Sequence, residues 1–100
     1  MKTASRRARF RFCLYVAGDA QNAAHATANL KALCRDHLAD GCEIEVVDVF
    51  RHPERALADG IFLTPTLIKL APSPAPRRIV GTLSQTQPVL QALGLEALAS

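Results

Sequence analysis

The sequence predicts a small α/β domain, and three consecutive segments support this prediction. From Phe10 to Val16, apolar residues alternate with other residues at a period of two, which is typical of a strand with two unlike faces. Between Ala23 and His37, small and apolar residues recur at spacings of three and four, as in a helix with one buried stripe. The run from Cys42 to Phe50 is rich in Val and Ile, which favours a second strand.

These segments predict a strand, a helix of about four turns and a parallel strand, joined by a right-handed crossover. Asp19 or Asn22 can cap the start of the helix, and Gly41 suits the left-handed residue after its end. Because Val47 and Val49 make the end of the second strand apolar on both faces, we expect that strand in the interior of the sheet.

The carboxy-terminal half predicts a short helix followed by two strands. Pro53 fits the first position of a helix from about His52 to Asp59, because a missing amide hydrogen costs nothing there. Strands are expected at Thr66–Leu70 and Arg78–Val80. The connection from Ala71 to Pro76 has prolines at alternate positions, so we expect it to be stiff and unable to pair fully as a strand.

A final helix is expected to begin at Ser84 or Thr86, because Pro88 is tolerated only in a first turn. Gly94 weakens this helix by roughly 1 kcal/mol relative to alanine. Its expected inward side chains are Val89, Leu90, Leu93 and Leu98. The order strand, helix, strand, helix, strand, strand, helix is the thioredoxin-like arrangement, with a parallel amino-terminal pair and an antiparallel carboxy-terminal pair.

Length and composition indicate one ordinary globular domain. The 100 residues are 49% hydrophobic and 21% charged, which argues against disorder or a fibre. No apolar run approaches the ~20 residues needed to cross a bilayer, and the start lacks the apolar centre of a signal peptide. We therefore expect residues 10–100 to form a single domain of a cytoplasmic protein, with no membrane partner.

The net charge of +3 comes from the amino terminus rather than from the domain. From Phe12 onward, seven basic residues stand against nine acidic ones, so the body is slightly acidic. We interpret residues 1–9 as a basic flexible arm. Because this arm lacks interleaved aromatic residues, we expect a solvated tail rather than a nucleic acid site. The basic residues that precede Phe12 are Lys2, Arg6, Arg7, Arg9 and Arg11.

The cysteines are odd in number and have no Cys-x-x-Cys spacing, so a disulfide framework is not expected. Cys34 and His37 would lie one turn apart on the first helix, and Cys42 follows, which raises the possibility of zinc. A fourth ligand is not evident. We therefore predict neither a metal nor a cofactor.

The sequence offers no catalytic group. Thioredoxin-like enzymes place a reactive cysteine between the first strand and first helix, but the stretch from Gly18 to Ala23 has no thiol and no serine. His25, His37 and His52 have no carboxylate or serine at a meaningful spacing, so they suggest no general base. Asp48, at the end of the second strand, is either a functional group or a cap on the following turn.

Thr64-Pro65 precedes a predicted strand, at the point where thioredoxin-like folds use a cis-proline. A cis bond is one interpretation. The other is a trans proline that starts a strand.

Three short pieces of the chain are Leu14–Gly18 (LYVAG), Thr64–Leu67 (TPTL) and Arg77–Gly81 (RRIVG). Taken in order, they resemble the KaiB family of circadian clock proteins. Val46–Val49 (VVDV) and the dipeptide at 83–84 (LS) also fall in the family's order. The resemblance runs from about residue 12 to about residue 95.

The resemblance implies a non-enzymatic protein that binds the ring-shaped ATPase KaiC. It also implies possible contact with a KaiA-like protein or with a sensor kinase that carries a KaiB-like domain. Members of the family change fold between two forms. The resting form has a different carboxy-terminal half and is usually tetrameric, and the other form is thioredoxin-like and binds KaiC. Two such forms coexist only if their free energies differ by a few kilocalories per mole. A homo-oligomer, dimeric or tetrameric, is therefore possible.

The chain departs from the family on the final helix. The family often has a glycine there and an aspartate two positions later, where this chain has Ala92 and Gly94. Alanine favours a continued helix, so Ala92 should support the thioredoxin-like form, whereas Gly94 acts in the opposite sense. We regard Pro65, Ala92 and Gly94 as fold-determining residues and expect the thioredoxin-like form to be substantially populated.

A second departure is electrostatic. The resemblance implies a partner-binding surface along the first helix and second strand, where the family has basic residues. Here His25, Glu43 and Glu45 occupy comparable places. Since charge complementarity selects partners, we expect a KaiC-like ATPase with a more basic patch, or a different partner.

The leading hypothesis is therefore a KaiB-like adaptor that binds a KaiC-family ATPase in circadian timekeeping or stress signalling. One alternative is a divergent thioredoxin-like redox protein that uses Cys13 or Cys34 with glutathione. Another is a stand-alone sensor domain, similar to the amino-terminal domain of the clock kinase, that does not switch fold.

Overall fold

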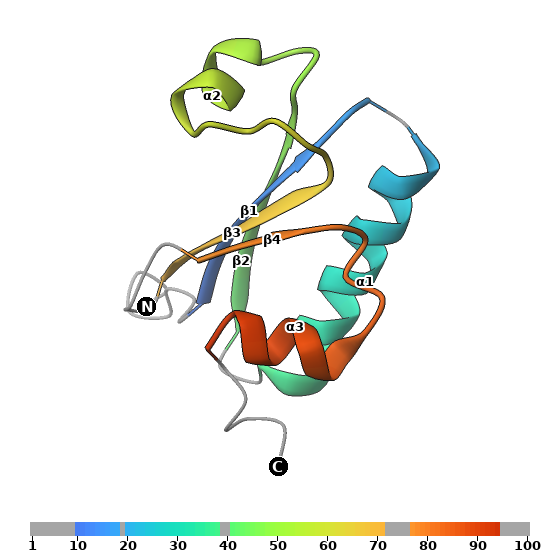
Figure 1. Cartoon of the computed structure of the whole chain (residues 1–100). Helices are drawn as coiled ribbons and strands as arrows, with labels where there is room; N and C mark the ends of the chain where they lie inside the picture. The colour runs from blue at the N-terminus through green and yellow to red at the C-terminus, as the bar shows by residue number, and fades with distance from the viewer. Residues whose placement is uncertain (1–9, 19, 39–40, 72–76, 95–100) are drawn as a thin grey trace, which may run out of the picture.

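The computed structural model describes residues 10–18, 20–38, 41–71 and 77–94. Within these residues, the elements follow the order that the sequence predicts (Figure 1). The predicted basic arm 1–9, residues 72–76 of the proline-rich connection and Leu98 lie outside the described residues. The strands are β1 (Phe10–Val16), β2 (Cys42–Asp48), β3 (Thr66–Ala71) and β4 (Arg77–Val80), and the helices are α1 (Gln21–His37), α2 (Pro53–Ala58) and α3 (Thr86–Ala92).

The strands of the described chain form one sheet in the order β2-β1-β3-β4. β1 runs parallel to β2 and antiparallel to β3, and β3 runs antiparallel to β4. The expectation that the second strand is interior is wrong, because β2 lies at an edge. Its apolar end has a different cause: Val47 is buried beside α2, while Val46, on the other face, is 45% exposed.

Both faces of β1 are buried, although its alternation predicted two unlike faces. The even-numbered residues of β1 pack with α1 and α3 in the larger core, to which Leu30, Leu90 and Leu93 also belong. Cys13 and Tyr15 face the other way, into a smaller core with Val47, Ala56 and Ile68. The second face is buried because α2 covers it, and neighbouring strands flank β1 on both sides.

The helix termini agree only in part with the predictions. α1 begins after Ala20 without a side-chain cap, so Asn22 is not the cap, and Asp19 lies outside the described residues. Pro53 opens α2, as predicted. α3 begins at Thr86, and Val89, Leu90 and Leu93 are buried, which confirms that prediction.

Gly94 lies beyond the end of α3 and does not weaken the helix from within. Its φ of 77° places it in the left-handed region, and its amide donates a hydrogen bond of 3.0 Å to the carbonyl of Gln91. Glycine adopts this conformation without the steric penalty that a Cβ brings. Gly94, which we expected to weaken the final helix, therefore terminates that helix instead.

Two local predictions concern turns. The Thr64-Pro65 peptide bond is cis, which is the first of the two interpretations left open above. Asp48 caps the turn after β2, because its Oδ1 accepts hydrogen bonds from the amides of Phe50 (2.9 Å) and Gly18 (3.1 Å).

None of the helices in the described parts of the chain combines the length and apolar character required to cross a membrane.

Candidate partner-binding surface

The outer edge of the sheet, where β2 lies beside α1, has a shallow groove of about 550 Å³. Val46 forms its β2 wall, on the same face of the strand as Ile44, which packs against the larger core. The α1 wall is made mostly of small side chains. The lining residues are Val16, Gly18, Ala20, Ala23, Ala24, Thr27, Ala28, Lys31 and Val46.

The groove follows from the alanine content of α1. Ala20, Ala24 and Ala28 recur at a spacing of four residues, which places them on one face of the helix. Side chains this short cannot cover the neighbouring edge strand, so Val46 stays accessible. The repeated alanines were the sequence signal for this groove, although the residues predicted for a partner-binding surface along the first helix and second strand were His25, Glu43 and Glu45.

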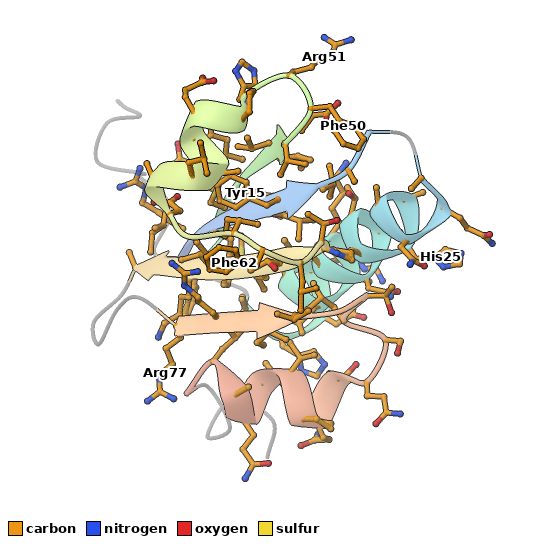
Figure 2. All side chains as sticks on the ribbon, turned by 45° about the horizontal axis from the view of Figure 1, so that its top comes forward. Tyr15, His25, Phe50, Arg51, Phe62 and Arg77 are labelled. Carbon is orange, nitrogen blue, oxygen red and sulfur yellow. The ribbon has the colours of Figure 1, made fainter. Side chains whose placement is uncertain are left out.

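Phe50 extends the apolar surface beyond the end of β2 (Figure 2). Its side chain is 74% exposed, and a Cβ built at Gly18 would lie 3.4 Å from its ring. The ring therefore lies against Gly18, which also lines the groove. Neither Val46 nor Phe50 was among the predicted site residues.

Glu43 and Glu45 lie on the opposite face of β2 from Val46, because side chains alternate along a strand. Glu43 accepts a hydrogen bond of 2.9 Å from Nε of Arg11. Glu45 is held at both carboxylate oxygens by Arg55 of α2, at 2.6 and 2.8 Å. This guanidinium lowers the pKa of Glu45. Each predicted acidic residue is thus paired with a cation of this same chain.

His25 is exposed on α1 (Figure 2). It follows Ala24 by one residue, or about 100° around the helix axis, and is not among the groove-lining residues. The structure therefore does not bring the three predicted partner-binding residues together. Glu43 and Glu45 lie on the face that α2 covers, and His25 lies on a helix that packs on the other face.

The predicted fold-determining residues lie at two separate places. Pro65 is buried before β3, and its carbonyl accepts a hydrogen bond of 2.9 Å from the amide of Gly81. Ala92 ends α3, and its carbonyl accepts a hydrogen bond of 3.3 Å from Nη1 of Arg77. Gly94 lies beneath the same guanidinium, since a Cβ built there would be 3.3 Å from its Cζ.

The thiols do not form an enzyme-like site at the end of β1. Cys13 is buried in the smaller core, and this burial raises its pKa, which disfavours the reactive thiolate. Cys34 and Cys42 line a different pocket, which His37 does not line. Among the described residues, no group of three or more His, Cys, Asp or Glu side chains is arranged to hold a metal ion.

Solved structures similar to this chain have the thioredoxin-like fold. The N-terminal domain of Synechococcus elongatus SasA matches with a TM-score of 0.71 and 17% identity, over 93% of this chain and 87% of that domain. Fasciola hepatica thioredoxin matches with a TM-score of 0.67 and 15% identity, over 92% of this chain and 85% of that one. The predicted thioredoxin-like arrangement is confirmed.

Sequence comparison identifies the family. The circadian clock protein KaiB3 of Synechocystis sp. is 41% identical over 83 residues, which cover 83% of this chain and 78% of that protein. The circadian clock oscillator protein KaiB of Rippkaea orientalis is 40% identical over 82 residues, or 82% of this chain and 78% of the relative. The KaiB domain matches residues 13–95. The chain therefore belongs to the KaiB family, whose characterised relatives are circadian clock proteins.

Proposed function

We propose that this protein is a non-enzymatic adaptor that binds a KaiC-family ATPase and acts in circadian timekeeping or stress signalling. Membership of the KaiB family over residues 13–95 is the observation that carries the proposal. A KaiA-like protein or a sensor kinase is a further possible partner, and self-association into a dimer or tetramer is compatible with the proposal.

The groove between α1 and β2 is the surface on which we place the ATPase. Among the described residues, no strand pairs with the outer side of β2, so its backbone groups are available to a partner strand. Val46 and Phe50 provide exposed apolar area next to that edge. Such side chains gain most when a partner removes them from water.

The charges of Glu43 and Glu45 contribute less to partner binding than the sequence alone predicts. Arg11 and Arg55 already pair with them, and exposed pairs of this kind have small net energies. We therefore propose that shape and apolar contact at the groove dominate affinity. The acidic pair then has a secondary role in selecting partners.

An adaptor without catalysis is consistent with the thiol environment. Of the thiols discussed above, Cys13 is the one on β1, and it is buried with a raised pKa. A redox enzyme of this fold requires an accessible thiolate near the start of the first helix. The family relatives are clock proteins by name, which supports the same proposal.

The adaptor proposal is tested by measuring the affinity of the purified KaiC-family ATPase of the same organism, with ATP present. Val46→Glu places a charge in the groove, and Phe50→Ala removes the exposed ring. We expect each to weaken binding at least about tenfold, the equivalent of about 1.4 kcal/mol.

Matched controls come from other exposed apolar residues. Val80 on β4, 56% exposed, is the counterpart of Val46 on the opposite edge strand, and Phe62, 90% exposed, is the counterpart of Phe50. Val80→Glu and Phe62→Ala should leave affinity unchanged. Wild-type binding that is undetectable would refute the adaptor proposal, and equal losses in the groove variants and the controls would refute the location.

A further inference from the structure

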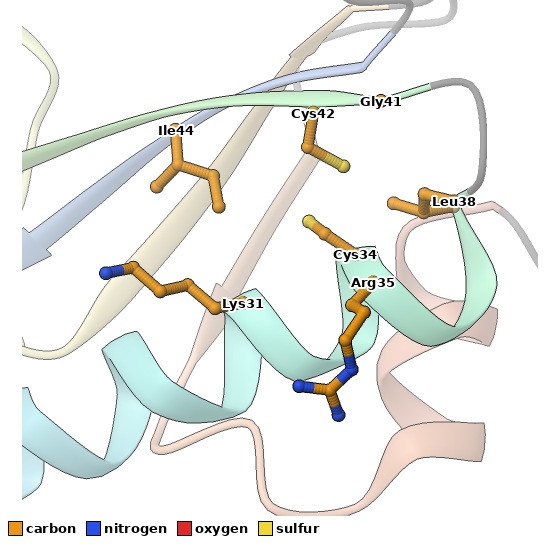
Figure 3. A pocket seen from close by; sticks show the side chains of 7 residues that line it. All are labelled: Lys31, Cys34, Arg35, Leu38, Gly41, Cys42 and Ile44. Carbon is orange, nitrogen blue, oxygen red and sulfur yellow. The ribbon is translucent and has the colours of Figure 1, made fainter.

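Cys34 and Cys42 face each other across a small pocket at the carboxyl end of α1 (Figure 3). Cys34 comes from the helix and Cys42 from the first position of β2. The pocket has a volume of about 330 Å³, and both cysteines are partly exposed at its wall. The adaptor proposal does not use this pair.

The two thiols influence each other's ionisation. Burial raises the pKa of Cys34, and the neighbouring Cys42 thiol raises it further. Burial also raises the pKa of Cys42, and the Cys34 thiol acts in the opposite direction there.

Two backbone hydrogen bonds of described residues shape the chain beside the pair. The amide of Leu38 donates a 3.0 Å hydrogen bond to the carbonyl of Cys34, which closes the last turn of α1. The amide of Gly41 donates a 2.9 Å hydrogen bond to the carbonyl of Leu38, and Gly41 has a φ of 98°. This left-handed glycine directs the chain into Cys42, and Cys34 and Cys42 line the same pocket.

We propose that Cys34 and Cys42 are an oxidation site, at which hydrogen peroxide converts the two thiols into an intramolecular disulfide. The Cys42 thiolate attacks one peroxide oxygen, the O–O bond breaks, hydroxide leaves and takes up a proton as water, and a sulfenic acid forms on Cys42. Cys34 then attacks the sulfenic sulfur, and the hydroxyl group departs as a second water. The sulfurs lose two electrons in total, which reduce one peroxide to two waters. A dithiol reductant reverses the change by thiol exchange.

Cys13 is unable to take part in this reaction. It is 3% exposed and faces the smaller core on the α2 side of the sheet, whereas Cys34 and Cys42 pack against the larger core on the other side. The product therefore has a single expected pairing.

The disulfide would tie α1 to the start of β2. Lys31 lines both this pocket and the groove between α1 and β2, so the two sites are adjacent along the same helix. The oxidation chemistry itself does not depend on the adaptor proposal, and its test requires no partner.

Peptide mapping of the full-length protein tests the site directly, because trypsin places each cysteine on a different peptide. Cleavage after Arg11, Lys31, Arg35 and Arg51 separates residues 12–31, 32–35 and 36–51, which carry Cys13, Cys34 and Cys42 respectively. After dilute peroxide treatment and digestion without reductant, we expect 32–35 linked to 36–51, with the loss of two hydrogen atoms and depletion of both free peptides. The link should vanish on treatment with dithiothreitol.

Single substitutions provide the controls. Cys13→Ser should form the same linked product, and Cys34→Ser or Cys42→Ser should abolish it. A non-reducing gel must show a monomer, because a link between two molecules would refute the intramolecular site. Links that involve the 12–31 peptide, or peroxide oxidation of Cys42 to sulfinic acid without any link, would also overturn the proposal. If a serine variant fails to fold, the wild-type peptide map alone decides.

Discussion

Asp48 shows how one side chain organises the end of β2. One carboxylate oxygen accepts backbone hydrogen bonds from both Phe50 and Gly18, so it fixes the loop after β1 relative to the turn after β2. The bond from the Phe50 amide is the main reason why the pKa of Asp48 is lowered. Asp48→Asn should therefore lower the free energy of unfolding, as measured by urea denaturation at neutral pH.

The loss of stability caused by Asp48→Asn should become smaller as the pH falls. A carboxyl whose pKa is lowered by folding stabilises the protein above its unfolded value of 3.8, and that stabilisation is lost as pH falls through the folded value. Wild type and Asp48→Asn should therefore converge in stability below about pH 4. Asp36→Asn is the control, because Asp36 also has a lowered pKa but its ion-pair partner is the exposed Arg35 rather than backbone amides. An equal loss in both variants would contradict the assigned role of Asp48.

Lys69 is the least expected residue of the sheet. It is 1% exposed and lies opposite Arg77 in the β3–β4 register. Within the described residues, its amine has no hydrogen bond or ion pair, and burial followed by the charge of Arg77 lowers its pKa. Because an uncompensated buried amine is costly, Lys69→Met should raise the free energy of unfolding by about 1 kcal/mol.

The stability gain from Lys69→Met should shrink as pH rises. A lysine whose folded pKa lies below 10.5 binds its proton more weakly in the native state, so wild-type stability improves between the folded value and 10.5. The variant lacks this improvement. Urea denaturation of both proteins at pH 7 and near pH 10 measures the difference, and a gain that grows with pH would disprove the explanation.

At the scale of the elements, two helices are each followed by a glycine in the left-handed conformation. Gly60 follows α2 with a φ of 66°, and Gly94 follows α3 with a φ of 77°. Gly60→Ala should cost about 1–2 kcal/mol of stability, because an L residue is strained in that region. Gly94→Ala should cost more, since its Cβ would also press against Arg77 at 3.3 Å, whereas nothing lies within 4 Å at Gly60.

A double-mutant comparison checks this explanation. In an Arg77→Ala background, the additional cost of Gly94→Ala over Gly60→Ala should disappear, because the neighbouring guanidinium is gone. Thermal or urea unfolding of the set is sufficient. Persistence of the difference without Arg77 would mean that another cause acts at the end of α3.

The proposed disulfide makes a prediction about how α1 and β2 are held together. A bridge from Cys34 to Cys42 closes a short loop, and the chain-entropy relation gives a stabilisation of about 2–3 kcal/mol. Oxidised Cys13→Ser protein should therefore resist urea better than the reduced form by about that amount. A lower stability after oxidation would indicate that the native geometry is strained by the bond.

The sequence predicted the helices and strands more successfully than it predicted which strands and side chains lie next to one another. The sequence located each of the described helices and strands: periodicity located β1 and α1, because it reflects which side chains are buried, Val and Ile content located β2, and proline positions located α2 and α3. It did not show that β2 is an edge strand, since side-chain pattern is insensitive to whether the backbone is paired on one side or two. The same limit applies to the candidate site. The sequence identified Glu43 and Glu45 as acidic, but only the structure reveals Arg11 and Arg55 beside them.

At the scale of the whole molecule, the thioredoxin-like form depends on α3 covering the sheet. Leu90 and Leu93 are fully buried against the same core as Phe12 and Leu14, and a helix is what brings both leucines to one side. Backbone chemical shifts should therefore be helical over Thr86–Ala92 in the major species in solution. Shifts typical of a strand across Val89–Leu93 would contradict this.

A substitution in α3 should change the ratio of the thioredoxin-like form to the resting form that the family resemblance implies. Ala92→Gly lowers helix propensity by about 1 kcal/mol, which corresponds to about a fivefold change in the ratio of the two populations. The minor set of resonances should grow by that factor relative to wild type. A spectrum without any second set in either protein would show that the carboxy-terminal half has one stable fold.

The pairing of β1 determines where the strands of the sheet would separate most readily. β1 is joined to β2 by an unbroken register along its whole length, but its register with β3 is interrupted between Arg11 and Phe12. Within the described sheet, β1 is thus the strand that pairs with strands of both halves of the chain, β2 on one side and β3 on the other, and its two registers are not equally regular. A rearrangement of the carboxy-terminal half would separate β3 from β1 along that interrupted register and remove α3 from the shared core, whereas the pairing of β1 with β2 and the groove between α1 and β2 are formed within the amino-terminal half.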